Sequence, residues 1–241
     1  MITSGNIKKF KNLISKNKTP YIILSILLFA VNAMVAILYY SNSLIFQKYL
    51  GHINPLIAFL GISILCFMLL SSSILTNWFS INKQKHYKEL LPYFLLIGIF
   101  VLTAILVDIN SPFPKNMNIE FPKALLFYPA IGFLVEILFH VLPMYILLSL
   151  FTLFLKGLNH KKAIWICIVI VATIEPTYQA IYMDSSPNWA IIITWLNLFL
   201  FNITQLAIFK KYDLITMYSF RLIYYAFWHI MWGYIRLNLL F

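Results

Sequence analysis

Two glutamates, two histidines and an arginine lie within stretches of this chain that are otherwise apolar. They are Glu136, His140, Glu175, Arg221 and His229. An ionisable side chain at the centre of a bilayer costs about 2.5–3.5 kcal/mol even on a lenient insertion scale, so such residues mark functional sites by default. A carboxylate next to an imidazole can activate water or bind a metal ion. The sequence therefore predicts a polar site buried among apolar helices.

Glu136 and His140 are spaced so that they share one face of a helix. Residues four apart on a helix lie about 6 Å from each other at Cβ. Both side chains could therefore act on one water molecule or one metal ion. The alternative is a hydrogen bond between them that only satisfies the two groups.

A second polar group surrounds a proline. Pro176 follows Glu175 and cannot donate a backbone hydrogen bond, which predicts a kinked helix and a freed carbonyl at Ala172. Broken helices occur at membrane depth where they line a cavity. Glu175 and Gln179 share one face at this kink. Glu175 is expected either to line a cavity there or to form a structural ion pair with Arg221.

The last apolar stretch carries a polar and aromatic stripe. Arg221, Tyr225, His229 and Gly233 follow one another at intervals of four, so they share a helix face that should point into the bundle. Arg221, Gln179 and Tyr225 are expected to support the site. Arg236 lies near the end of this stretch and is expected to extend its side chain to the membrane surface.

Composition determines which elements must position these residues. The 241 residues are 62% hydrophobic and 10% charged, with a mean hydropathy of +0.86. Continuous apolar runs of about 20 residues are typical of transmembrane helices and exclude an alternating β-barrel. The chain is predicted to be an all-α, polytopic helical bundle with about seven spans. They are 21–40, 56–76, 90–107, 124–155, 163–183, 188–209 and 214–240.

One of these stretches, 124–155, is too long for a single straight crossing. Pro129 and Pro143 within it predict a kink, a lead-in segment or an additional eighth helix.

The formal net charge of +11 is explained by the positions of the lysines relative to the membrane, so no nucleic-acid partner is predicted. Thirteen lysines lie in the amino-terminal tail and in every second connection, against three in the alternate connections. This asymmetry predicts a multi-pass protein of the cell membrane with a cytoplasmic amino terminus. Residues 1–20 are predicted to be a basic cytoplasmic tail, and 21–241 a single transmembrane domain.

The order of these motifs resembles the CPBP family of intramembrane proteases, which includes CAAX prenyl proteases and bacteriocin-processing or self-immunity proteins. The family carries EExxxR, FxxxH and HxxxN motifs on successive helices. Here Val135–His140 is similar to the first, Val171–Glu175 to the second and His229–Gly233 to the third, within a region of about 120–240. Val135 replaces the first glutamate, His140 the arginine, Glu175 the histidine and Gly233 the asparagine.

This resemblance implies hydrolysis of a peptide bond within the membrane, in an active or an inactive divergent member. Glu136 or Glu175 would activate water, and His140 and His229 would orient it. Gln179 or Tyr225 would replace the missing oxyanion donor. The same four residues, Glu136, His140, Glu175 and His229, could instead hold Zn²⁺ or Fe²⁺.

Two other classes of function stay open from the sequence. One is a non-catalytic membrane protein, such as an immunity factor that binds a peptide or partner helix, with Glu175–Arg221 and Glu136–His140 as a structural network. The other is a carrier of protons or small solutes. The sequence shows no repeated half, and this counts against a carrier.

Overall fold

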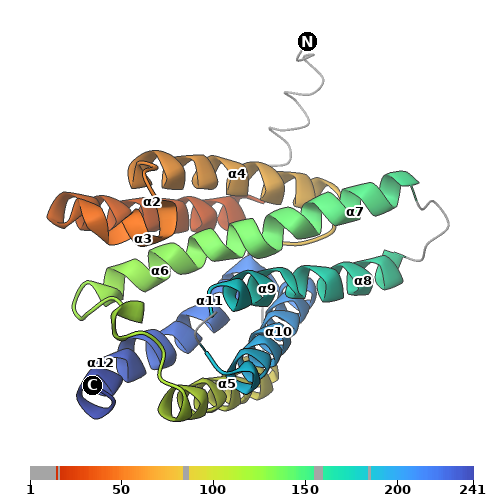
Figure 1. Ribbon diagram of the computed structural model, residues 1–241. Coiled ribbons are helices and arrows are strands. Elements are labelled where there is room, and N and C mark those ends of the chain that lie inside the picture. Colours follow the sequence, from red (N-terminus) through yellow and green to blue (C-terminus); the bar gives the residue numbers. More distant parts are fainter. Residues whose placement is uncertain (1–14, 16, 84–86, 155–159, 184–185) are drawn as a thin grey trace.

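The computed structural model describes residues 15, 17–83, 87–154, 160–183 and 186–241 (Figure 1). These residues form helices joined by short connections, with no strand among them, which confirms the predicted all-α fold. Most of the tail predicted at 1–20 lies outside the described residues.

The helices agree closely with the predicted spans. They are α2 (Lys18–Ser41), α3 (Gln47–Leu50), α4 (Pro55–Leu75), α5 (Leu91–Asn110), α6 (Ala124–Val135), α7 (Leu142–Phe154), α8 (His160–Ala172), α9 (Ile174–Ile181), α10 (Asn188–Lys211), α11 (Leu214–Tyr225) and α12 (Gly233–Leu239). Two π-helical turns, η4 (Glu136–Val141) and η5 (Ala226–Trp232), join α6 to α7 and α11 to α12. Short 3-10 turns occur at Ser43–Phe46, Tyr87–Glu89 and Lys115–Met117.

Within the described residues, six helices are long and apolar enough to cross a membrane, as in a multi-pass membrane protein. They are Lys18–Ser41, Pro55–Leu75, Leu91–Asn110, Ala124–Phe154, Lys161–Ile181 and Asn188–Lys211. The seventh predicted span is helical through α11, η5 and α12 but is not one of these six. Many large apolar side chains face outward, including Phe29 and Leu95, which suits contact with lipid.

A long central helix organises the bundle. In Figure 1, α6 and α7 run as one helix across the molecule, with α2 and α4 on one side and α5, α9 and α10 on the other. α11 packs against α5, α6 and α10, and therefore lies beside the central helix. The stretch 124–154 does not split, so no eighth helix arises there.

Candidate functional site

The two π-helical turns carry three of the predicted site residues. Glu136 and His140 lie in η4, and His229 lies in η5. Pro143 follows η4 and has no N–H to donate to the preceding turn, while the N–H of Leu142 reaches five residues back to the carbonyl of Ile137. A π turn widens the helix locally, and such turns occur frequently at functional sites.

Arg221 is the centre of a buried polar network. Its Nε donates to Oε1 of Glu136 at 2.6 Å, and its two terminal nitrogens donate to both oxygens of Glu175 at 3.0 and 2.9 Å. The same nitrogens donate to the hydroxyl of Tyr225 at 3.0 Å and to Oε1 of Gln205 at 2.8 Å. All five guanidinium N–H groups therefore have an acceptor, the most that an arginine can satisfy.

Each carboxylate in this network also accepts a hydrogen bond from a side-chain amide. Gln205 also donates to Oε1 of Glu136, and Gln179 donates to Oε1 of Glu175 at 3.2 Å. Glu136 and Arg221 are 0% and 1% exposed, and Glu175 is 3% exposed. The ion pair proposed between Glu175 and Arg221 as a structural alternative is therefore present, and Glu136 shares the same arginine.

His140 lies between the two carboxylates. Its Nδ1 is 3.1 Å from Oε2 of Glu136, and its Nε2 is 3.6 Å from Oε2 of Glu175. Neither contact has the geometry of a hydrogen bond, so both ring nitrogens and Oε2 of Glu136 are buried without a hydrogen-bond partner among the described residues. His140 therefore contacts both carboxylates that share Arg221.

The kink predicted at Pro176 is present, and the carbonyl that it frees has a hydrogen-bond partner. α8 ends at Ala172 and α9 begins at Ile174, with Glu175 and Pro176 in its first turn. The side chain of Asn202 on α10 donates to the carbonyl of Ala172 at 3.4 Å. The kink thus turns Glu175 toward Arg221, and the carbonyl that Pro176 releases is not left unsatisfied.

A glycine allows the central helix to approach α11 closely. A Cβ added at Gly132 would lie 3.0 Å from the ring of Tyr225 and 3.6 Å from Cδ of Arg221. Replacing Gly132 with alanine is therefore expected to lower the free energy of unfolding by about 1–3 kcal/mol, because the ring is held by its hydrogen bond to Arg221. Chemical unfolding in detergent measures this. Gly98→Ala is the control, because a Cβ there meets nothing within 4 Å; equal stability of both variants would contradict the close packing.

His229 lies apart from this network. Its Nδ1 is 3.2 Å from Oδ1 of Asn118, and its ring stacks on Tyr128 at a centroid distance of 4.5 Å. Tyr225 separates it from Arg221, touching the imidazole edge-on at 4.8 Å. The four residues predicted as one catalytic group therefore divide into a cluster of three and one separate histidine.

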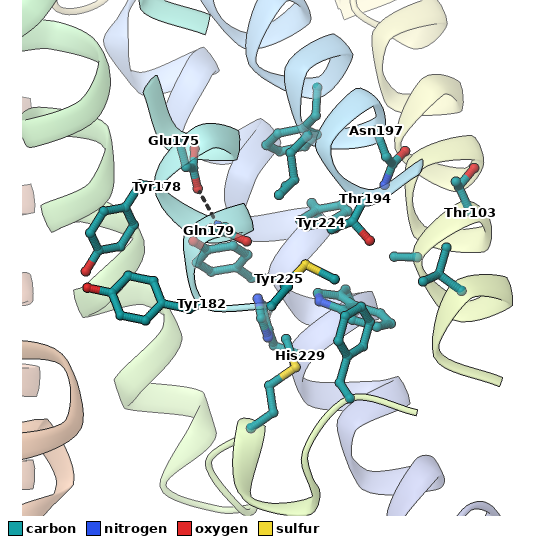
Figure 2. Close-up of a pocket in the computed structure, with 18 of the residues that line it drawn as sticks. Thr103, Glu175, Tyr178, Gln179, Tyr182, Thr194, Asn197, Tyr224, Tyr225 and His229 are labelled. Carbon is teal, nitrogen blue, oxygen red and sulfur yellow. Dashed lines mark hydrogen bonds between the residues drawn. The ribbon is translucent and has the colours of Figure 1, made fainter. Parts of the chain in front are cut away.

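A cavity of about 510 Å³ joins the two parts of the site. Glu175, Gln179, Arg221, Tyr225 and His229 all contribute to its lining, together with apolar residues of α5 and α10 (Figure 2). Figure 2 shows Glu175 and Gln179 on α9 facing the same space as Tyr225 and His229 on the last helix. Glu136 and His140 lie behind this lining and do not reach the cavity.

The arrangement does not fit the metal site that the residue types allowed. Both oxygens of Glu175 and Oε1 of Glu136 accept from Arg221, and His229 contacts Asn118 rather than His140. Within the described part of the chain, no three histidine, cysteine or acidic side chains are grouped so that they could hold a metal ion.

The prediction that Arg236 extends to the membrane surface is wrong. Arg236 is 1% exposed and donates to both carboxylate oxygens of Asp108, at 2.6 and 2.8 Å. Trp232 donates to the same carboxylate at 2.7 Å. Asp108 on α5 is itself buried and within hydrogen-bond distance of Arg236 on α12, so the guanidinium turns inward to this carboxylate.

Sequence reasoning also missed two amide side chains of the site. Gln205 lies within an apolar span, and this alone was a usable signal for an inward-facing polar residue. Asn118 lies in the connection before α6, where no periodicity predicts which way a side chain points.

Comparison with protein-family models, with curated proteins and with solved structures finds no match for this chain.

Proposed function

We propose that this chain is a divergent intramembrane protease of the CPBP type, inserted in the cell membrane with a cytoplasmic amino terminus, and that it hydrolyses a peptide bond in the cavity. The observation that carries the proposal is that Glu175, Arg221, Tyr225 and His229 all line one largely apolar cavity. An apolar cavity with a few convergent polar groups is the usual form of a ligand site. The resemblance of the motifs adds the reaction class.

The geometry favours His229 over the two carboxylates as the group that activates water. Both oxygens of Glu175 accept from Arg221, and Glu136 does not reach the cavity. His229 lines the cavity, and no hydrogen bond to its Nε2 is found among the described residues. In this mechanism Nε2 takes a proton from water as the water oxygen attacks the carbonyl carbon, and returns it to the amine when the C–N bond breaks.

Tyr225 has the position of an oxyanion donor. Its hydroxyl oxygen accepts from Arg221 at 3.0 Å, which leaves the hydroxyl proton available to a negative oxygen in the cavity. The positive charge of Arg221 behind the hydroxyl strengthens such a donor. Glu136 and Glu175 then act by holding Arg221 in place.

We expect His229→Gln to lower the rate of peptide cleavage about a hundredfold, the lower end of what a general base contributes. The purified full-length protein in detergent is mixed with a library of apolar, transmembrane-like peptides in ¹⁸O-labelled water. Mass spectrometry then detects new carboxyl termini that carry the label. His52→Gln is the matched control, because His52 is exposed in a connection.

The same assay separates the alternatives. Loss of cleavage in Glu175→Gln with full activity in His229→Gln would assign the base to the carboxylate. Peptide retained on the protein with no labelled terminus would contradict the protease and support a non-catalytic peptide-binding or immunity protein. The saturation of Arg221 by its five acceptors favours that second function, since it is typical of a structural ion-pair network.

A further inference from the structure

The connection between α5 and α6 places the side chain of Asn118 next to His229. Oδ1 of Asn118 lies 3.2 Å from Nδ1 of the imidazole. A carbonyl oxygen can only accept, so with the amide in this orientation the contact places the proton of His229 on Nδ1. The other ring nitrogen, Nε2, is then an acceptor.

The side chain of Asn118 is held in place by its neighbours. The hydroxyl of Tyr128 donates to Oδ1 at 3.5 Å and accepts from the backbone N–H of Ile119 at 2.9 Å. The ring of the same tyrosine stacks on His229, with an angle of 14° between the planes. Asn118 and His229 are therefore fixed by one shared residue.

The position of Asn118 also depends on a glycine. A Cβ added at Gly233 would lie 2.5 Å from Nδ2 of Asn118, closer than side-chain carbons approach. Nδ2 is buried and has no hydrogen-bond partner among the described residues. A buried donor without a partner costs about 1–3 kcal/mol. An orphaned polar group of this kind calls for an explanation, and a positioning role at the site is one.

We propose that Asn118 is a positioning residue that selects the Nδ1–H tautomer of His229, and that Gly233 makes room for it. An orienting acceptor on one imidazole nitrogen fixes the tautomer and the direction of the ring. The inference deepens the proposed function, because a base in the cavity needs an unprotonated Nε2. The tautomer itself can be measured whether or not the protein cleaves peptides.

The test is ¹⁵N NMR of histidine-labelled full-length protein in detergent, with His229→Gln to assign the signals. We expect wild type to show the Nδ1–H tautomer. Asn118→Asp keeps the acceptor and should keep this tautomer, whereas Asn118→Leu removes the acceptor and should give a tautomer mixture. Gly233→Ala should reproduce the leucine variant without changing residue 118, since the added methyl displaces the amide.

The outcomes are distinct from those of the protease assay. An Nε2–H tautomer in wild type, or an unchanged tautomer in both Asn118→Leu and Gly233→Ala, would overturn the role of Asn118. Where cleavage is measured, Asn118→Leu should lower kcat about tenfold and leave KM unchanged, and Asn118→Asp should restore kcat. If no cleavage is found in wild type but the tautomers respond as expected, only the proposed reaction fails.

Discussion

Replacing Arg221 with methionine is expected to lower the free energy of unfolding by about 3–5 kcal/mol, the cost of leaving one side of a buried ion pair unpaired. Here one guanidinium serves two carboxylates, Glu136 and Glu175, which are both buried. Methionine has a similar length and fills much of the same space, so the loss reports charge and hydrogen bonding rather than a cavity. The free energy of unfolding of Arg221→Lys should lie between those of wild type and Arg221→Met, because an ammonium cannot donate to both carboxylates in the same way.

Removing the carboxylate charges tests the reason for this loss. The triple variant Arg221→Met, Glu136→Gln, Glu175→Gln should recover most of the lost stability, because no unpaired charge remains. Unfolding in detergent measures all the variants, with Lys115→Met, an exposed site, as the control. Equal stability of Arg221→Met and wild type, or a triple variant no more stable than Arg221→Met, would contradict the network described here.

The pair of Arg236 and Asp108 is the second place where a single change should have a large effect. Replacing Arg236 with methionine leaves a buried aspartate unpaired and should also cost about 3–5 kcal/mol. Arg236 in addition donates to the carbonyls of Phe113 and Pro114, at 2.6 and 3.2 Å. The N–H of Phe113 in turn donates to Asp108 at 2.8 Å. The pair therefore holds the connection that carries Asn118.

Hydrogen exchange can locate this effect along the chain. In Arg236→Met, the amides of 111–119 should exchange faster than in wild type, while those of α2 and α4 should change little. Lys48→Met is the matched control, since Lys48 contacts the carbonyl of Asn116 in the same connection at 3.1 Å, but from an exposed position. Exposed contacts contribute about 0–1 kcal/mol. Unchanged protection of 111–119 in Arg236→Met would show that other contacts hold this segment.

Local rules explain which parts of the site could be predicted from the sequence. The spacing of Glu136 and His140 placed them on one face, and their side chains are in contact. The proline rule gave the kink beside Glu175. Each of these inferences needs only one helix at a time.

The remaining parts depend on the relation between helices. The spacing along one helix does not say which side chains of other helices it faces, so His229 could not be separated from His140 in advance. The pairing of Arg236 required knowing that α5 and α12 are neighbours, and Asn118 required the path of a connection. The orientation of the chain across the membrane stays a prediction from its lysines.

The π turn in the last helix changes the direction in which the side chains after it point, relative to those before it. In an uninterrupted α-helix, twelve residues make three and a third turns, so Gly233 would point about 120° away from Arg221. A π turn accommodates one additional residue, which reduces this offset to about 20°. Arg221 and Arg236, on either side of η5, would therefore keep their partners in a chain shortened by one residue within 226–232. The orientation of His229 and of the other side chains within the turn depends on that residue, whereas the two arginines outside it do not.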